Sequence, residues 1–150
     1  MSVEELYRDV ILDHYRKPRH PGELENADAK VEGVNPSCGD ELLLTLRWDG
    51  DTVADAAISG TGCSISQASA SMMTDTIIGM TADDVRQLVS RFKAMMTIEE
   101  GDPGIDPDRP GAVLGDIEAL QGVRKFPVRI KCADLAWTAL EEVLSQHSNA

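Results

Sequence analysis

Three cysteines and one aspartate are the residues whose types and spacing could perform chemistry in this 150-residue chain. Cys38 and Asp40 lie in "SCGD", Cys63 follows "SGTG", and Cys132 lies in "FPVRIKCADLAW". Three thiolates and one carboxylate provide four ligands, a set that suits tetrahedral Zn²⁺. A thiolate is also the form of cysteine that attacks sulfur–sulfur bonds. The sequence therefore predicts a metal or reactive-thiol site, provided that the fold brings these residues together.

Other interpretations of these residues stay open at the level of spacing. A lone cysteine is most often a small buried hydrophobic residue, and Cys132 beside Ala133 could be only that. Asp40 could be a solvated turn residue, and a disulfide between Cys38 and Cys63 also fits the expected geometry. An odd and small number of cysteines favours reduced thiols in a cytoplasmic protein over a disulfide framework. The CxxC pairs typical of zinc knuckles are not present in the sequence.

A predicted β-hairpin should bring the first two thiols to one end of a sheet. Extended segments over 41–48 and 52–59 flank Asp-Gly at 49–50, which is a strong hairpin signal. A turn at this point gives cross-strand partners whose numbers sum to about 100 or 101, so that Cys38 faces Cys63. Facing residues in antiparallel strands lie about 5 Å apart at Cβ, and we therefore expect the two thiols to be neighbours.

The same register pairs Asp40 with Thr61. In an extended segment Asp40 points to the same side as Cys38, two residues earlier. Glycines stand beside the thiols in both "SCGD" and "SGTGCS". Because glycine has no Cβ, these positions allow tight turns or the close approach of a ligand.

Helices should support the thiols from the other side. A stretch rich in small residues and Met predicts a buried helix over 64–78, directly after Cys63. The last helix is expected from near residue 130, with Cys132 at its start. A helix N-terminus stabilises a thiolate through its free N–H groups and its dipole.

The remaining elements fit a single domain over residues 1–150. Apolar residues spaced three and four apart predict a helix over 3–17, capped by Ser2 and ended by Pro18, with His14 partly packed against the core. Further expectations are a strand over 28–34, a helix over 82–96 capped by Thr81, an acidic loop over 99–111 and a short helix over 112–123.

The composition is that of a globular protein with a strong acidic balance. Hydrophobic residues make up 42% and charged residues 27%, and the formal net charge is −12. This charge argues against a nucleic-acid partner and against attachment to anionic membranes. The sequence holds no apolar run of about 18 residues, and its N-terminal stretch is unlike a signal peptide. We therefore expect a cytoplasmic protein with no nucleic-acid or membrane partner.

Four segments are similar to motifs of the IscU/NifU-like iron–sulfur assembly family. "LYRDVILDHYRKPRHPG", "NPSCGD", "GTGCSIS" and "FPVRIKCADLAW" occur in that family's order and spacing, over about residues 2–140. The resemblance implies an α+β fold, SufE/NifU-like and IscU-type, in which a three-stranded antiparallel sheet has helices packed on one face and the site at one end. It also implies that the metal ligands are Cys38, Asp40, Cys63 and Cys132.

Two departures resemble the SufU-type branch of this family, whose members are zinc-dependent sulfurtransferases. Scaffold members carry a His directly before the third cysteine, within an LPPVK-like chaperone-binding segment, and this chain has Lys131 there. The chain also carries an extra stretch between Cys63 and Cys132, which includes "GDPGIDPDRPGAVLGDIEALQGVRKFP".

For that branch the resemblance implies a mechanism and a set of partners. A SufS-type, pyridoxal-phosphate-dependent cysteine desulfurase forms a persulfide, a partner histidine replaces Cys38 on the zinc, and the freed Cys38 thiolate accepts the outer sulfur. The sulfur then passes to downstream iron–sulfur assembly scaffold proteins. Arg129 and Lys131 could balance the negative charge of the site, or be solvated charges. The residues that could dock the desulfurase are Arg16, Lys17, Arg19 and His20.

Two other functions remain alternatives at this level. A scaffold could assemble a [2Fe–2S] cluster on the same four ligands. A structural zinc module could act only as an adaptor between other proteins.

Overall fold

The predicted helices and strands are all present in the computed structural model, which describes residues 2–36, 38–106 and 108–148. One prediction differs in type, because the short helix expected over 112–123 is a 3₁₀ helix. In chain order the elements are α1 (Val3–Arg16), β1 (Ala29–Asn35), β2 (Asp40–Asp49), β3 (Thr52–Thr61), α2 (Ser64–Ile77), α3 (Ala82–Met95), the 3₁₀ helix η1 (Gly115–Val123) and α4 (Pro127–Ser148).

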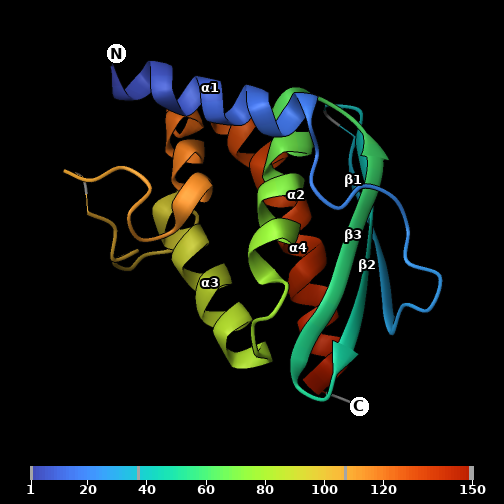
Figure 1. The fold of residues 1–150 in the computed structure, drawn as a ribbon. Helices are drawn as coiled ribbons and strands as arrows, with labels where there is room; N and C mark the ends of the chain where they lie inside the picture. Colours follow the sequence, from blue (N-terminus) through green and yellow to red (C-terminus); the bar gives the residue numbers. More distant parts are fainter. Residues whose placement is uncertain (1, 37, 107, 149–150) are drawn as a thin grey trace.

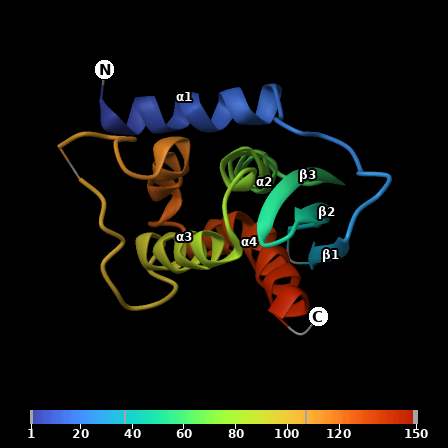
Figure 2. The same ribbon diagram turned by 60° about the horizontal axis from the view of Figure 1, so that its bottom comes forward.

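An antiparallel sheet of strand order β1-β2-β3 carries the helices on one face, as Figures 1 and 2 show. Helix α2 packs against β3, and α4 packs against β1 and β2, while α1, α3 and η1 lie outside them. This arrangement confirms the predicted α+β fold. No helix within the described ranges is both long and apolar enough to cross a bilayer.

The core lies between the sheet and the two inner helices. Leu44 and Leu46 of β2 point to the same face and are completely buried, as the two-residue period of a strand requires. The paired methionines of α2, Met72 and Met73, are buried in the same core, in agreement with their predicted role as core residues. Burial of each such side chain stabilises the fold by about 1.5–3 kcal/mol.

The helix caps agree with the sequence patterns. The Ser2 hydroxyl accepts a hydrogen bond from the Glu5 N–H at 3.1 Å, and the Thr81 hydroxyl accepts one from the Asp84 N–H at 3.2 Å. Each cap pairs an N–H group that the first turn of a helix leaves without an internal partner.

The predicted hairpin register is wrong by one residue at the site end. The turn forms at the predicted position, but the pairing shifts between Arg47 and Trp48, where β3 contains an extra residue. This β-bulge makes Glu41 the partner of Thr61, which had been assigned to Asp40. Turn chemistry fixes the register only next to the turn, so the bulge was not visible in the sequence.

The last helix begins earlier than predicted. It starts at Pro127, a residue that favours the first helical position because it has no N–H to satisfy. Cys132 therefore lies in the second turn of α4 and not at its N-terminus, so the predicted stabilisation of this thiolate by free N–H groups does not apply.

A buried carboxylate organises the extra stretch before α4. The acidic residues over 99–106 and 108–111 form no helix or strand, as predicted. The Glu118 carboxylate, 1% exposed, accepts hydrogen bonds from the N–H groups of Gly111, Val113 and Leu114 at 2.8–3.1 Å. These bonds fold the end of the loop back onto η1.

Candidate metal and thiol site

The four residues predicted to form a site converge at one end of the sheet. The Sγ atoms of Cys38 and Cys132 lie 3.2 Å apart, although 94 positions separate them in the sequence. Ligand atoms of Cys38, Asp40 and Cys132 all lie within 4.8 Å of one another. The Cys63 Sγ is 4.0 Å from the Asp40 Oδ2. Two thiols and one carboxylate thus lie close enough to share one metal ion, and the Cys63 thiol lies beside Asp40, outside the group within 4.8 Å.

All three cysteines are free thiols, so the disulfide alternative between Cys38 and Cys63 is wrong for this structure. The short sulfur–sulfur contact joins Cys38 to Cys132 instead of Cys63. Cys38 and Cys63 both lie beyond the ends of the strands, where the hairpin pairing no longer determines which residues face each other.

Asp40 is fully buried and is held by the N-terminus of α2. Its Oδ1 accepts the backbone N–H of Cys63 at 2.8 Å, which leaves Oδ2 on the side of the Cys63 sulfur. Cys63 is the N-cap residue of α2, but its side chain makes no capping bond. The carboxylate of Asp40 thus pairs the N–H of the N-cap residue, at the end of the helix where the dipole favours negative charge.

Gly62 allows this close approach. A Cβ atom built at Gly62 would lie 2.4 Å from the Asp40 Oδ1 and 2.8 Å from the Ser66 hydroxyl oxygen. Gly39 has a φ of +69° in the turn between Cys38 and Asp40. The prediction that glycines beside the thiols serve tight turns and close approach is confirmed at both positions.

Cys132 is 2% exposed and rests on a rigid support. The buried Ser69 hydroxyl of α2 donates to the backbone oxygen of Ala133 at 2.6 Å and accepts the indole N–H of Trp137 at 3.0 Å. These bonds fix the second turn of α4 against α2. Ser69 was not predicted, because a serine in an apolar helix gives no sign of a partner 64 residues away.

Cys38, by contrast, lies half-buried in the loop between β1 and β2. Its N–H donates to the backbone oxygen of Asn35 at 3.2 Å, and the Asn35 amide lies 3.8 Å from the Cys132 Sγ as a donor. Asn35 is a second residue that sequence reasoning missed. Its position three residues before Cys38 was the feature of the sequence that could have indicated a contact with the site.

The electrostatics of the cluster favour a bound cation. Burial raises the pKa of the Cys132 thiol, and hydrogen bonding to Cys38 and Asp40 acts in the same direction. Deprotonation of closely spaced buried thiols therefore needs a positive charge among them. Sulfur and carboxylate ligands match the preference of Zn²⁺ or of iron–sulfur clusters, so the residues present fit either group.

The basic residues near the last cysteine are exposed. Lys131 points to solvent, and the Arg129 guanidinium lies 5.4 Å from the centroid of the Phe126 ring. Their role in balancing the charge of the site stays a prediction.

The comparisons with known proteins agree with this geometry. The model of the family "NifU-like N terminal domain" matches residues 6–147. The chain is 51% identical to the Bacillus subtilis protein named zinc-dependent sulfurtransferase SufU, over 94% of this chain and 90% of that one. It is 41% identical to the Streptococcus pyogenes iron–sulfur cluster assembly scaffold protein IscU, over 99% and 89% of the two chains.

Among solved structures, FiSufU of Fervidobacterium islandicum AW-1 aligns with a TM-score of 0.81 and 36% identity, covering 94% of this chain and 98% of that one. A Brucella abortus NifU-like N-terminal domain, at 24% identity, shares the fold with a TM-score of 0.82, over 99% of both chains. The match along nearly the whole chain, in sequence and in fold, shows that this protein belongs to the NifU-like N-terminal domain family.

Proposed function

We propose that this protein is a zinc-dependent sulfurtransferase that accepts persulfide sulfur for iron–sulfur cluster assembly. The observation that carries the proposal is the convergence of Cys38, Asp40 and Cys132 within 4.8 Å. The Cys63 sulfur lies beside them. The similarity to the Bacillus subtilis SufU supports the same function.

Cys38, Asp40, Cys63 and Cys132 would hold the metal. Bound zinc keeps thiolates deprotonated at neutral pH and covers them until they are needed. Cys63 and Cys132 begin or lie within helices, and Asp40 is fully buried, so these three ligands are preorganised. Cys38 lies in a loop and is the ligand best placed to move.

Cys38 is therefore the residue that accepts sulfur. Its thiolate attacks the outer sulfur of a persulfide on a partner cysteine, so that one sulfur–sulfur bond forms at Cys38 as the partner's breaks. The partner cysteine leaves as a thiolate, and the persulfide now resides on Cys38. No external oxidant or reductant is needed, because the step is a thiol–disulfide type of exchange.

The partner that this chemistry requires is a SufS-type, pyridoxal-phosphate-dependent cysteine desulfurase. Iron–sulfur assembly scaffold proteins would receive the sulfur, and the reducing cytoplasm would keep the three thiols free. The exposed basic residues Arg16 and Lys17, at the end of α1 and directly after it, provide a docking surface in a chain whose net charge is −12. The whole chain acts as one domain in this proposal.

The second candidate is a scaffold for a [2Fe–2S] cluster. The similarity to the Streptococcus pyogenes IscU favours it, and the same ligands could hold the cluster. The exposed Lys131, at the position where scaffold members carry a histidine, argues against it.

A desulfurase assay with and without this protein tests the proposal. We expect the wild type to stimulate turnover and Cys38→Ala to abolish the stimulation, because no sulfur acceptor remains. Asp40→Ala should reduce stimulation by weakening metal binding, which metal analysis would show as zinc loss. Full stimulation by Cys38→Ala would exclude the transfer role and leave an adaptor.

The purified protein itself distinguishes the two candidates. Brown protein with visible absorption would support the scaffold, whereas colourless protein with one zinc per chain supports transfer.

A further inference from the structure

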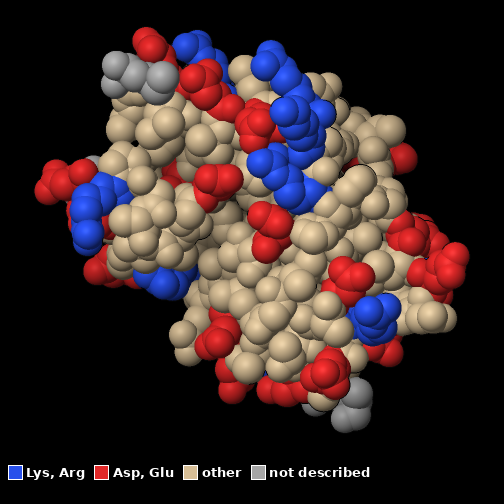
Figure 3. All heavy atoms as spheres, in the orientation of Figure 1, with Lys and Arg blue, Asp and Glu red and all other residues tan. Residues whose placement is uncertain are grey.

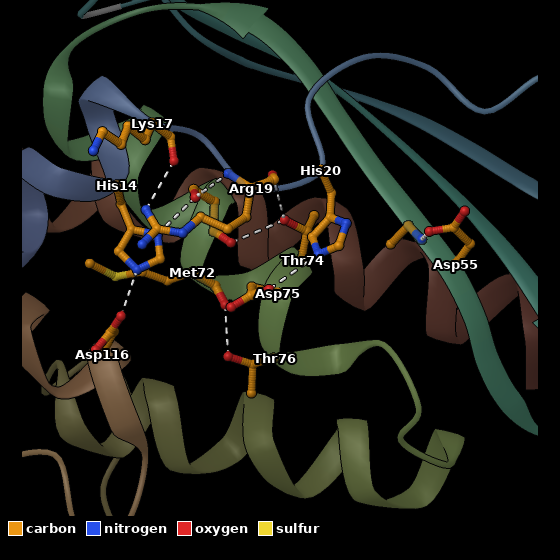
Figure 4. A network of polar contacts seen from close by, with 12 residues as sticks. His14, Lys17, Arg19, His20, Asp55, Met72, Thr74, Asp75, Thr76 and Asp116 are labelled. Carbon is orange, nitrogen blue, oxygen red and sulfur yellow. Dashed lines mark hydrogen bonds and ion pairs between the residues drawn. The ribbon is translucent and has the colours of Figure 1, made fainter.

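A polar network holds the segment between α1 and β1 onto α2, and Figure 4 shows its members. His14 of α1 is 1% exposed, although the sequence predicted only partial packing. Its Nδ1 lies 2.8 Å from the Ser71 hydroxyl of α2, and its Nε2 lies 2.8 Å from the Asp116 carboxylate of η1. One buried imidazole thus connects three elements that are far apart in the sequence.

Ser71 also holds the backbone of the segment between α1 and β1 in place. Its hydroxyl oxygen accepts the backbone N–H of Arg19 at 2.9 Å. The neutral tautomer of His14 with a proton on Nε2 is compatible with all of these hydrogen bonds, because Ser71 then donates to Nδ1 and Asp116 accepts from Nε2. In the next turn of α2, the Thr74 hydroxyl lies 3.5 Å from the Arg19 backbone oxygen, although it is closer to the Ala70 backbone oxygen, at 3.0 Å.

The guanidinium of Arg19 is also engaged within the molecule. One nitrogen donates to the Asp13 carboxylate at 2.7 Å and another to the Lys17 backbone oxygen at 2.9 Å. The bond from Arg19 holds the pKa of Asp13 below its usual value. His20 is paired in a similar way, with Asp75 at 3.1 Å. Two of the four basic residues that the sequence offered for docking are therefore already bonded inside the protein.

The other two basic residues remain available. Arg16 and Lys17 are exposed, and across residues 2–36, 38–106 and 108–148 the side chain of neither makes an ion pair or a hydrogen bond. Figure 3 shows basic side chains gathered over the end of α1 and the segment after it, on a molecule whose net charge is −12. An acidic partner would find attraction here and repulsion over much of the remaining surface.

This surface is close enough to the thiols to share one interface with them. The segment pairs with β3, where the Ile58 N–H donates to the His20 oxygen at 3.0 Å. Five residues lead from Ile58 to Cys63, the last two beyond the end of β3, a span of at most about 17 Å. Along α2, Ser71 lies eight residues after Cys63, about 12 Å. A standard interface covers about 800 Å² per partner, a patch about 30 Å across, so one partner can contact both.

We propose that Arg16 and Lys17 contact an acidic surface of the desulfurase, and that Arg19, His14 and Ser71 are positioning residues that hold the backbone of this segment in the docking conformation. The inference rests on the proposed function, since it concerns how the sulfur donor docks. Of the four basic residues that the sequence offers for docking, Arg16 and Lys17 contact the partner. Arg19 and His20 form bonds within the protein.

The salt dependence of docking distinguishes the two roles. Charges that face the partner lose their attraction as salt rises, whereas an internal contact leaves the number of interfacial charges unchanged. We expect Arg16→Gln and Lys17→Gln each to raise the KM for this protein in the desulfurase assay about threefold at low salt and to flatten its dependence on salt. Ser71→Ala and Arg19→Gln should raise KM by a similar factor, with the salt dependence and kcat of wild type.

A measurement without the partner tests the positioning role separately. Amide hydrogen exchange at the Arg19 N–H should accelerate at least tenfold in Ser71→Ala, because its acceptor is lost, and stay unchanged in Arg16→Gln. Ser69→Ala is the matched control, since Ser69 is an equally buried serine of α2 whose hydroxyl bonds to Ala133 instead. It should leave the exchange of Arg19 unchanged.

A different measured outcome would overturn each part of the proposal. A flattened salt dependence in Arg19→Gln would overturn the internal role of Arg19, and an unchanged KM in both Arg16→Gln and Lys17→Gln would overturn the docking surface. Unchanged Arg19 exchange in Ser71→Ala would overturn the positioning role. If wild-type protein fails to stimulate the desulfurase at all, the proposed function itself is wrong, whatever the exchange data show.

Discussion

Cys38 and Cys132 place their sulfur atoms 3.2 Å apart but are supported in opposite ways. Cys132 is buried in a helix that Ser69 and Trp137 fix against α2. Cys38 lies in a short loop, half-buried, with one backbone hydrogen bond to Asn35.

The difference shows how one cluster can both hold a metal and release a nucleophile. A ligand on a rigid element binds with little further loss of conformational entropy, whereas a loop ligand loses entropy each time it binds. The rigid ligands therefore supply most of the affinity, and the loop ligand exchanges most readily. Under the proposed function, this contrast gives the role of retaining the metal to Cys132 and the role of accepting sulfur to Cys38.

Alanine substitution at the two cysteines is the strongest test of this contrast. Structural zinc sites contribute about 10–16 kcal/mol over four ligands, so loss of one rigid ligand should lower affinity at least 100-fold. We expect Cys132→Ala to show this loss and Cys38→Ala only about a tenfold loss, because water can occupy an open fourth position. Competition with a zinc-binding dye measures both values. Equal losses would show that loop and helix ligands contribute alike.

Gly62→Ala tests the rigid half of the site without removing a ligand. The new Cβ would collide with the Asp40 Oδ1 at 2.4 Å and displace the carboxylate from the Cys63 N–H. Changes to groups that orient ligands typically cost 10–100-fold in metal affinity, and we expect about tenfold here.

Gly50→Ala is the control for this substitution. Gly50 lies in the hairpin turn with a φ of +62°, and a Cβ there would meet nothing within 4 Å. The change should cost about 1–2 kcal/mol of stability from backbone strain and leave zinc affinity unchanged. Equal zinc affinity in Gly62→Ala and Gly50→Ala would exclude the close approach as the cause.

Asp134→Asn gives the smallest effect and probes a carboxyl of α4 that lies two residues after Cys132 in the sequence. The Asp134 Oδ1 is buried and has no hydrogen-bond partner among the described residues. Burial is the main cause that raises the pKa of this carboxyl from 3.8 to about 6. Between these values the folded state binds more protons than the unfolded state, so stability falls as pH rises and the loss is complete above about pH 6.

A shift of this size corresponds to about 3 kcal/mol at full burial, but solvent screening of a partly exposed side chain reduces the expected effect to on the order of 1 kcal/mol. Asp134→Asn should therefore be more stable than wild type at pH 7–8, and the difference should shrink towards pH 4. Urea unfolding of both proteins across this range measures it. A constant difference at every pH would assign the effect to packing instead of ionisation.

Periodicity, caps and turn residues in the sequence predicted the elements well, because each depends on neighbours within a few positions. The Asp-Gly turn placed the hairpin, and Ser2 and Thr81 marked the starts of two helices. The bulge between Arg47 and Trp48 was not predicted, since it arises from how the strands fit the rest of the fold. The strand register does not determine whether Cys38 faces Cys63, because both residues lie beyond the ends of the strands.

The sequence by itself determined which side chains could act as ligands, because thiols and carboxylates are recognised by residue type alone. It also determined the helices and strands that carry them. Only the tertiary structure decided that Cys132 is the neighbour of Cys38, that Ser69 and Ser71 of one helix serve different ends of the molecule, and that Arg19 is bonded internally. These contacts join residues 52 to 94 positions apart, and local patterns carry no information about partners at that separation.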